Sequence, residues 1–141
     1  YFPAVGSVTL AHISVDLQTG SLPIMLPTLL VALNLNYALA AGIVAANQIV
    51  IAIAQPLFGI LGDKKSFKWM VPVGCLLTAL GMATVLWMPS YAWVIVAVLL
   101  SGLGSAMFHP EAISRVRANS GAQTASGTSI FFSGCCPPPW V

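Results

Sequence analysis

Charged side chains are what this sequence has least of. Among 141 residues there are five lysines or arginines and three aspartates or glutamates, so only 6% of the chain is charged. Soluble domains carry about 25% charged residues, and a chain this short has too much surface to do without them. The composition therefore excludes an ordinary soluble domain. The net charge of +2 comes from two short stretches, which excludes the extended basic patch of a nucleic-acid-binding protein.

Cysteine is scarce as well. Its three copies, Cys75, Cys135 and Cys136, form no C-x-x-C pair and no metal-ligand spacing, so they predict neither a disulfide framework nor a zinc site. We expect no cofactor and no metal. The first residue is Tyr1, and no basic segment with a cleavage site precedes the first apolar stretch, so a signal peptide is not expected. We expect an internal piece of a longer protein.

Long apolar runs are abundant, because 58% of the residues are hydrophobic. A membrane-spanning helix needs about 20 mostly apolar residues. Four runs are long enough, at residues 5–35, 37–61, 69–88 and 91–113. A fifth begins near residue 128 and stops at Pro137, Pro138 and Pro139, since consecutive prolines cannot continue a helix. We therefore predict an all-α, multi-pass membrane protein that is surrounded by the lipid bilayer.

The basic residues lie in only two stretches between these runs. Lys64, Lys65 and Lys68 follow the second run, and Arg115 and Arg117 follow the fourth. Cytoplasmic loops are enriched in lysine and arginine, so both stretches are predicted as cytoplasmic loops of an inner (plasma) membrane protein whose N-terminus is also cytoplasmic. Tyrosine and tryptophan prefer the membrane interfaces. The outer interface is predicted at Tyr37, Trp87, Tyr91 and Trp93, and the inner one at Trp69.

Small residues recur at the spacing that lets membrane helices approach closely. Gly42 and Ala46 are four apart in the second run, and Gly102 and Ala106 are four apart in the fourth. The alternative is that small residues are simply common in such helices. Kinks or helix ends are expected at Pro23, Pro27, Pro56 and Pro72.

An acid and a histidine interrupt the first run. Asp16 lies in its middle, and His12, four residues earlier, shares the same helical face. A charge in the bilayer core costs roughly 2.5–3.5 kcal/mol on insertion scales. We therefore interpret the pair as a proton or substrate site that faces a polar cavity, the alternative being a structural clamp between helices. Gln18 is a further candidate, although it points elsewhere on the helix unless Pro23 distorts the turn.

A second polar group lies at the end of the fourth run. His109 and Glu111 are predicted as a proton relay, a gate contact or a cap on the end of a neighbouring helix. The structural alternative is a salt bridge from Glu111 to Arg115, because residues four apart are neighbours on a helix. Neutral polar residues of the second run are expected to form interhelical hydrogen bonds rather than to bind a ligand. These are Asn47, Gln48 and Gln55.

The stretch between the second and third runs carries a recognisable motif. Gly59-x-x-x-Asp63-Lys64-x-x-x-Lys68 resembles the G-x-x-x-D-[RK]-x-x-x-[RK] signature of the major facilitator superfamily. It falls on the loop that the charge rule places in the cytoplasm. The resemblance implies that Gly59, Asp63, Lys64 and Lys68 belong to a cytoplasmic gate. Ser66 stands where many members have glycine, which weakens the case for a tight turn there.

Further segments share a second resemblance. They include His12-x-x-x-Asp16-x-Gln18-x-Gly20-x-Leu22-Pro23, Gln55-Pro56-Leu57-Phe58-Gly59, Ser101-Gly102-Leu103-Gly104 and Phe108-His109-Pro110-Glu111-Ala112. Together they resemble the fosmidomycin-resistance branch of the same superfamily. This resemblance implies a proton-coupled drug exporter, not an enzyme, with twelve helices in two six-helix halves.

The same resemblance implies how the chain fits into that fold. Residues 1–134 would form helices one to four and the start of the fifth, and the partners would be a small-molecule substrate, protons and a missing C-terminal half. Residues 135–141 depart from the family, and our hypothesis is a frameshift or a broken gene end. The rival interpretation is a non-transporting membrane scaffold, or an intramembrane enzyme that uses His109 and Glu111.

Overall fold

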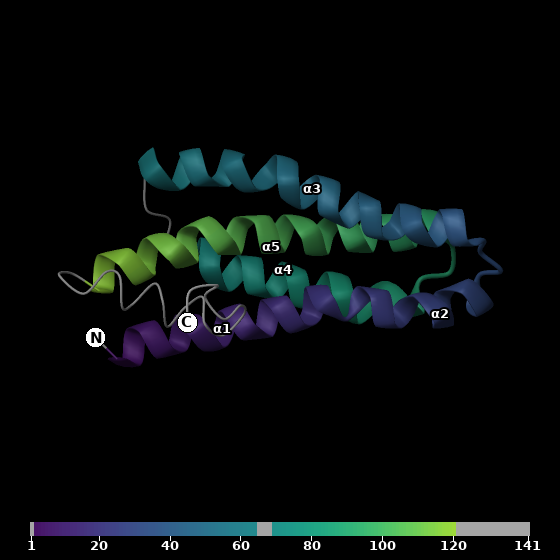
Figure 1. Cartoon of the computed structure of the whole chain (residues 1–141), viewed down its shortest axis with the longest axis horizontal. Helices are drawn as coiled ribbons and strands as arrows, with labels where there is room; N and C mark the ends of the chain where they lie inside the picture. Colours follow the sequence, from purple (N-terminus) through teal and green to yellow (C-terminus); the bar gives the residue numbers. More distant parts are fainter. Residues whose placement is uncertain (1, 65–68, 121–141) are drawn as a thin grey trace, which may run out of the picture.

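The structure, a computed structural model, describes residues 2–64 and 69–120, which form a bundle of helices running side by side (Figure 1). The helices are α1 (Phe2–Gly20), α2 (Leu22–Ala32), α3 (Tyr37–Lys64), α4 (Met70–Thr84) and α5 (Tyr91–Ser120), with a short 3₁₀ helix, η1 (Val85–Trp87), after α4. The described residues contain no strand. The prediction of an all-α protein is confirmed.

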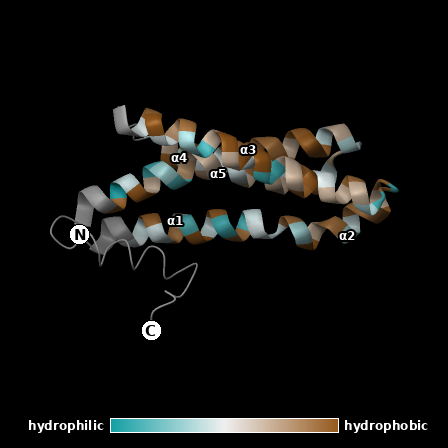
Figure 2. Ribbon diagram, turned by 45° about the horizontal axis from the view of Figure 1, so that its top comes forward, coloured by the Kyte–Doolittle hydropathy of each residue, from teal (hydrophilic) through white to brown (hydrophobic). Residues whose placement is uncertain are grey.

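Four stretches of the described residues are long and apolar enough to cross a membrane. They are Gly6–Ala32, Tyr37–Gly62, Met70–Trp87 and Tyr91–Val116, and they agree with the predicted spans to within a few residues. Large apolar side chains such as Leu10, Ile24 and Ile53 are exposed on the outside of the bundle, where lipid tails are as apolar as leucine. Hydrophilic residues recur along α1 among these apolar ones (Figure 2).

The first span consists of two helices, separated at Ser21, which agrees with the expectation of a kink or a helix end at Pro23. Pro23 lies in the first turn of α2, and it has no N–H to donate to the carbonyl four residues earlier. The helical hydrogen-bond pattern is therefore interrupted at this point. The hydroxyl of Ser21 donates to the carbonyl of Gln18 at 2.6 Å and so satisfies one acceptor at the end of α1. Pro27 and Pro56, in contrast, lie inside α2 and α3.

Two helices extend into the stretches that were predicted as cytoplasmic loops. α5 runs to Ser120, so Arg115 and Arg117 are helical where a loop was predicted, and α3 likewise continues to Lys64. Neither proline nor glycine follows Pro110 within α5, so nothing in the local sequence ends the helix at the edge of the apolar span. Outside the described residues lie Lys65, Lys68, the fifth helix predicted near residue 128 and the tail at 135–141.

Exposed aromatic side chains lie at the helix ends. Tyr37 opens α3, Trp87 closes η1 and Trp93 is in the first turn of α5, and each is more than half exposed. The connections from α2 to α3 and from η1 to α5 meet at one end of the bundle, far from the N-terminus (Figure 1). Trp69, also exposed, precedes α4 at the opposite end. This sorting is what two membrane interfaces require.

α5 is the central helix, with α1, α3 and α4 packed against it. Of its apolar span 56% is buried, compared with 17% of the span formed by α1 and α2. The closest approach is to α4: a Cβ on Gly74 would stand 2.7 Å from the carbonyl oxygen of Gly104, and one on Gly104 would stand 2.6 Å from that of Gly74. The two helices therefore touch backbone to backbone, which only glycine permits.

Two of the small residues predicted to pack closely, Gly42 of α3 and Gly102 of α5, lie where these two helices meet and not at the contact with α4. A Cβ on Gly102 would stand 3.1 Å from the carbonyl oxygen of Asn47, and one on Gly42 would stand 2.9 Å from the hydroxyl of Tyr91. The sequence analysis did not single out the Gly74–Gly104 crossing.

Two clusters of buried apolar side chains stabilise the bundle. The cluster nearer the α2–α3 connection contains Leu22, Leu29, Ile43, Met82, Val85, Val94, Ala97 and Val98. The cluster nearer the opposite end contains Val15, Val71, Phe108, Ala112 and Val116. The polar residues singled out in the sequence lie alongside and between these clusters.

Candidate functional site

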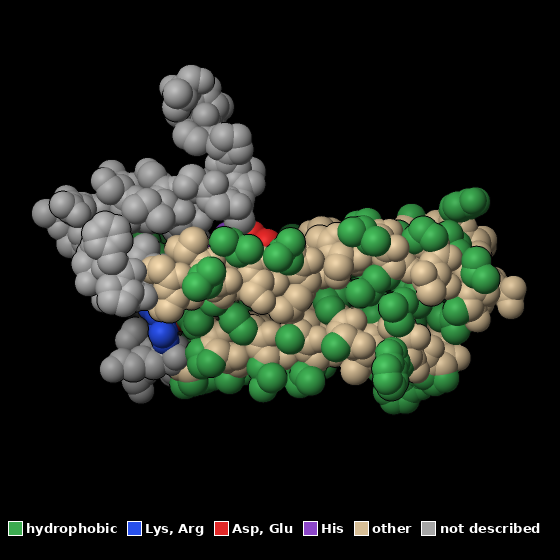
Figure 3. All heavy atoms as spheres, turned by 90° about the horizontal axis from the view of Figure 1, so that it is seen from below, with side chains coloured by type: hydrophobic (Ala, Val, Ile, Leu, Met, Phe, Trp, Pro, Cys, Tyr) green, Lys and Arg blue, Asp and Glu red, His purple; other side chains and the backbone are tan. Residues whose placement is uncertain are grey.

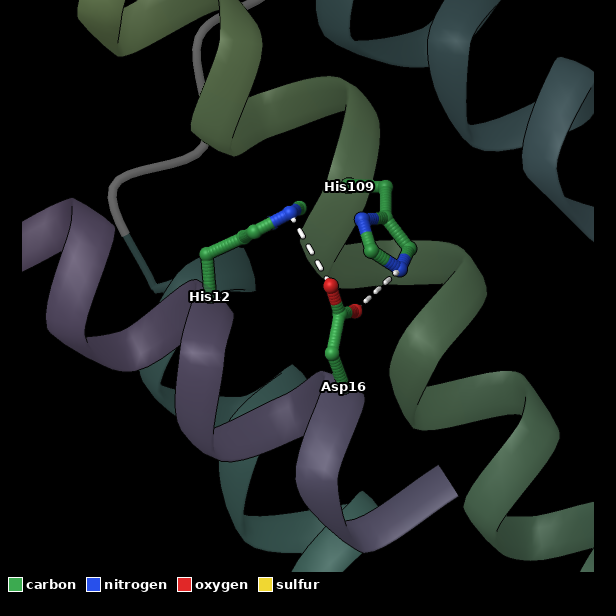
Figure 4. A group of neighbouring side chains, drawn as sticks. All are labelled: His12, Asp16 and His109. Carbon is green, nitrogen blue, oxygen red and sulfur yellow. Dashed lines mark ion pairs between the residues drawn. The ribbon is translucent and has the colours of Figure 1, made fainter. Parts of the chain in front are cut away.

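Three side chains from two helices meet inside the apolar part of the bundle (Figure 4). Asp16 of α1 lies between two imidazoles, with its Oδ2 atom 3.2 Å from Nε2 of His12 and its Oδ1 atom 3.7 Å from Nε2 of His109. His12 is on the same helix, one turn earlier, whereas His109 comes from α5. His12 and Asp16 are paired, as their spacing suggested. His109 was a candidate in its own right, but its contact with Asp16 was not predicted.

The aromatic ring of Phe108 packs behind this cluster and contacts both imidazoles. Phe108 is fully buried. Its ring centroid is 6.0 Å from that of His12 and 5.7 Å from that of His109. The two imidazole rings themselves meet edge to face, with centroids 5.1 Å apart. The packing places both rings beside Asp16.

A cavity of about 420 Å³ opens beside the cluster. Its lining residues are Asp16, Thr19, Gly20, Leu22, Pro23, Val44, Asn47, Gln48, Ile51, Gln55, Ser105 and His109. Four helices contribute, namely α1, α2, α3 and α5. His12, which is only 4% exposed, lies behind the wall, whereas the side chain of Asp16 is 36% exposed. Among the described residues on the face shown in Figure 3, acidic surface appears at one spot, surrounded by hydrophobic and uncharged atoms.

Gln18 does not join the cluster. Its side-chain amide donates to the hydroxyl of Ser14 at 3.1 Å, on an exposed part of α1, and it does not line the cavity. This agrees with the expectation that Gln18 points elsewhere on the helix. The break at Ser21 follows it and leaves the Asp16 turn regular.

The side chains of Glu111 and His109 have different surroundings in the structure. His109 faces the cavity, whereas Glu111 does not line it and has only 3% of its side chain exposed. Nε of Arg115 donates to Oε1 of Glu111 at 3.3 Å, so the predicted i+4 salt bridge is confirmed. Oε2 of Glu111 lies 3.6 Å from the place where a Cβ on Gly62 would stand, beside the last turns of α3. An enzyme that uses His109 and Glu111 together has no support in this geometry.

The neutral polar residues of α3 divide between two roles. The amide of Asn47 donates to the carbonyl oxygen of Val98 at 2.8 Å and is buried, which confirms the predicted interhelical hydrogen bond. Gln48 and Gln55 were expected to form similar bonds, but the structure places them on the cavity wall. Their spacing of seven residues on one helix is a signal that the sequence offered, since residues seven apart share a face.

The gate motif is only partly described. Gly59 lies against α5, where an added Cβ would stand 3.9 Å from Cβ of Pro110. Asp63 and Lys64 are the last two residues of α3, with side chains outside the described part of the structure, and Lys68 is outside it altogether. Their role in a gate stays a prediction.

An acid held between two imidazoles beside a cavity, within apolar membrane spans, is typical of membrane transport proteins. Residues 8–135 match the Major Facilitator Superfamily. The chain therefore belongs to this family of membrane transporters.

Two curated relatives are similar to the chain over most of its length. It is 29% identical over 133 residues to the fosmidomycin resistance protein of Escherichia coli (strain K12), which covers 94% of this chain and 33% of the relative. It is 27% identical over 133 residues to an uncharacterized MFS-type transporter of Bacillus subtilis (strain 168), covering 94% of this chain and 32% of the relative. The chain thus spans about a third of the length of the curated relatives it matches. No solved structure gives a significant match.

Proposed function

We propose that this chain supplies part of the translocation path of a proton-coupled exporter of small molecules, with drug efflux as its activity. The observation that carries the proposal is the cavity beside Asp16 and His109, because it lies within the apolar spans and is lined by groups that bind substrates or protons. In this proposal the chain forms helices one to four of the N-terminal half of a twelve-helix transporter.

The cluster geometry supports the proton-coupling part of the proposal. A carboxylate in the bilayer core is costly unless it is paired or faces a polar cavity, and Asp16 meets both conditions. Carboxylates and imidazoles exchange protons readily, and intramembrane chains of such groups are common in proton-driven transporters. Asp16, His12 and His109 are therefore the proposed proton or substrate contacts, whereas Gln18 and Glu111 are weaker candidates because neither lines the cavity.

The drug-efflux part of the proposal is supported by the similarity to the fosmidomycin resistance protein of Escherichia coli. Transport in this class proceeds by alternating access around a site near the bilayer midplane. The cavity of this chain lies beside the middle of the first span, where such a site is expected.

The test is Asp16→Asn in a full-length transporter that carries this chain. The amide keeps the size and hydrogen-bonding capacity of the side chain but cannot exchange a proton. Proton-driven export should fall to background while the amount of protein in the membrane stays unchanged. Leu10→Ala, on the same helix but exposed on the outside of the bundle, is the control and should export normally. Normal export by Asp16→Asn would reduce the cluster to a structural clamp.

The proposal also includes an orientation in the inner membrane. The Gly59–Lys68 motif and the end of α5 are proposed to be cytoplasmic, because all five basic residues lie in these two segments. The N-terminus is proposed to lie on the same side, because two spans separate it from the motif. A reporter fused after Lys68 or Arg117 should read as cytoplasmic, and one fused after Pro89 should read as external. An external signal at Lys68 would overturn the orientation and, with it, the cytoplasmic gate proposed for Asp63, Lys64 and Lys68.

A further inference from the structure

We propose that His12, Asp16 and His109 form a binding site for a divalent transition metal of the zinc class. The three side chains each offer one ligand atom, and these atoms all lie within 4.8 Å of one another. The proposal concerns ion binding by this chain and does not require that the chain transports anything. Cysteine spacing in the sequence predicted no metal site, and the site proposed here contains no cysteine.

The distances are close to those of a zinc site. Zinc bonds to histidine nitrogen and carboxylate oxygen are about 2.0–2.2 Å long in tetrahedral sites, which puts neighbouring ligand atoms about 3.3 Å apart. His12 Nε2 is already 3.2 Å from one carboxylate oxygen of Asp16, and His109 Nε2 is 3.7 Å from the other. A small rotation of the carboxylate and of the His109 ring brings all three ligands onto one ion.

The ligand chemistry selects the metal. Two imidazoles and one carboxylate suit Zn²⁺ and its first-row neighbours, whereas Ca²⁺ and Mg²⁺ prefer all-oxygen sets. Three protein ligands leave one tetrahedral position open, as in catalytic rather than structural zinc sites. Here the open position would face the cavity, because Asp16 and His109 both line it. Water, or an oxygen atom of a substrate, can complete the shell there.

The surrounding structure holds the ligands in place. His12 and Asp16 are one turn apart on α1, and His109 is on α5, the most buried helix of the bundle. Phe108 packs against both imidazoles, and ligands on packed helices are better positioned than ligands on loops. A bound ion would join α1 to α5. It would also occupy the groups proposed to carry protons, so ion binding and proton transfer would exclude each other.

The experiment measures ion binding by the 141-residue chain, purified with a chelator, freed of it and reconstituted in lipid nanodiscs. Co²⁺ is the spectroscopic probe, because its visible absorption intensity distinguishes four-coordinate from six-coordinate sites, and Zn²⁺ is then added to displace it. All three cysteines are first changed to serine, so that no thiolate contributes. We expect one Co²⁺ per chain with four-coordinate absorption, displaced by stoichiometric Zn²⁺.

The variants His12→Gln, Asp16→Asn and His109→Gln should each weaken binding by at least about tenfold, the minimum seen when the surroundings of a metal site are altered. Gln48→Leu, on the cavity wall but not a ligand, should bind normally. Circular dichroism confirms that each variant keeps its helices, and His109→Gln, which changes the partly exposed end of the cluster, is the variant least expected to unfold. The absence of stoichiometric binding by the parent chain, or normal binding by folded His109→Gln, would overturn the proposal. Either result leaves the export test with Asp16→Asn unaffected.

Discussion

The two sides of α5 are built in opposite ways. Toward α4, the helices meet at Gly74 and Gly104 with backbone against backbone and no space for a methyl group. Toward α1 and α3, α5 borders a cavity of about 420 Å³ with polar side chains on its wall. In a membrane, helices associate through close packing and interhelical hydrogen bonds rather than through burial of apolar surface. The comparison teaches that one side of α5 fixes the bundle, whereas the other leaves room for a ligand.

The largest effect should come from filling the fixed side. Gly104→Ala places a methyl group 2.6 Å from the carbonyl oxygen of Gly74 and the same distance from the backbone nitrogen of Thr78, so α4 and α5 must separate. Overpacking of this kind costs about 1–3 kcal/mol, and more where backbone is the obstacle. The free energy of unfolding, measured in detergent by titration with sodium dodecyl sulfate, should fall by at least about 1 kcal/mol. Gly6→Ala is the matched control, because nothing lies within 4 Å of its new methyl group. Equal stability of the two variants would contradict the backbone crossing.

A smaller effect is expected where the Asn47 side chain of α3 hydrogen-bonds to α5. Asn47→Leu keeps the side-chain volume but removes the 2.8 Å bond to the carbonyl of Val98. Interhelical hydrogen bonds in membranes contribute about 0.6 kcal/mol on average and up to about 1.7. We expect a loss of about 1 kcal/mol in the same unfolding titration. No loss at all would mean that Asn47 serves the cavity alone.

The smallest effect is expected on the cavity wall. Gln48 follows Asn47 in the sequence but lines the cavity and is exposed. Gln48→Leu should change the free energy of unfolding by no more than about 0.5 kcal/mol, as is usual for substitutions away from packed features. A cost as large as that of Asn47→Leu would show that the cavity side is packed as tightly as the rest.

The sequence predicted the parts of this comparison that are local. Spans follow from apolar length, and the pairing of His12 with Asp16 and of Glu111 with Arg115 follows from the helical repeat. His109 joins Asp16 only because α1 packs against α5, and no periodicity within one helix determines which helices touch. The same holds for Gly74 and Gly104, which lie in separate spans. At Pro23 the sequence predicted a kink or a helix end and could not decide between them, because proline is compatible with both.

The two partners of Asp16 become available at different times during synthesis. The nascent chain delivers α1 to the membrane first, and His109 follows roughly 5 to 20 s later at ordinary rates of translation. Through that interval His12, 3.2 Å away on the same helix, is the imidazole that accompanies the acid into the translocon. A residue one turn distant therefore accompanies the acid before the bundle exists, and the later arrival of α5 adds a second imidazole from another helix. The order of synthesis thus separates a contact within one helix from a contact between two.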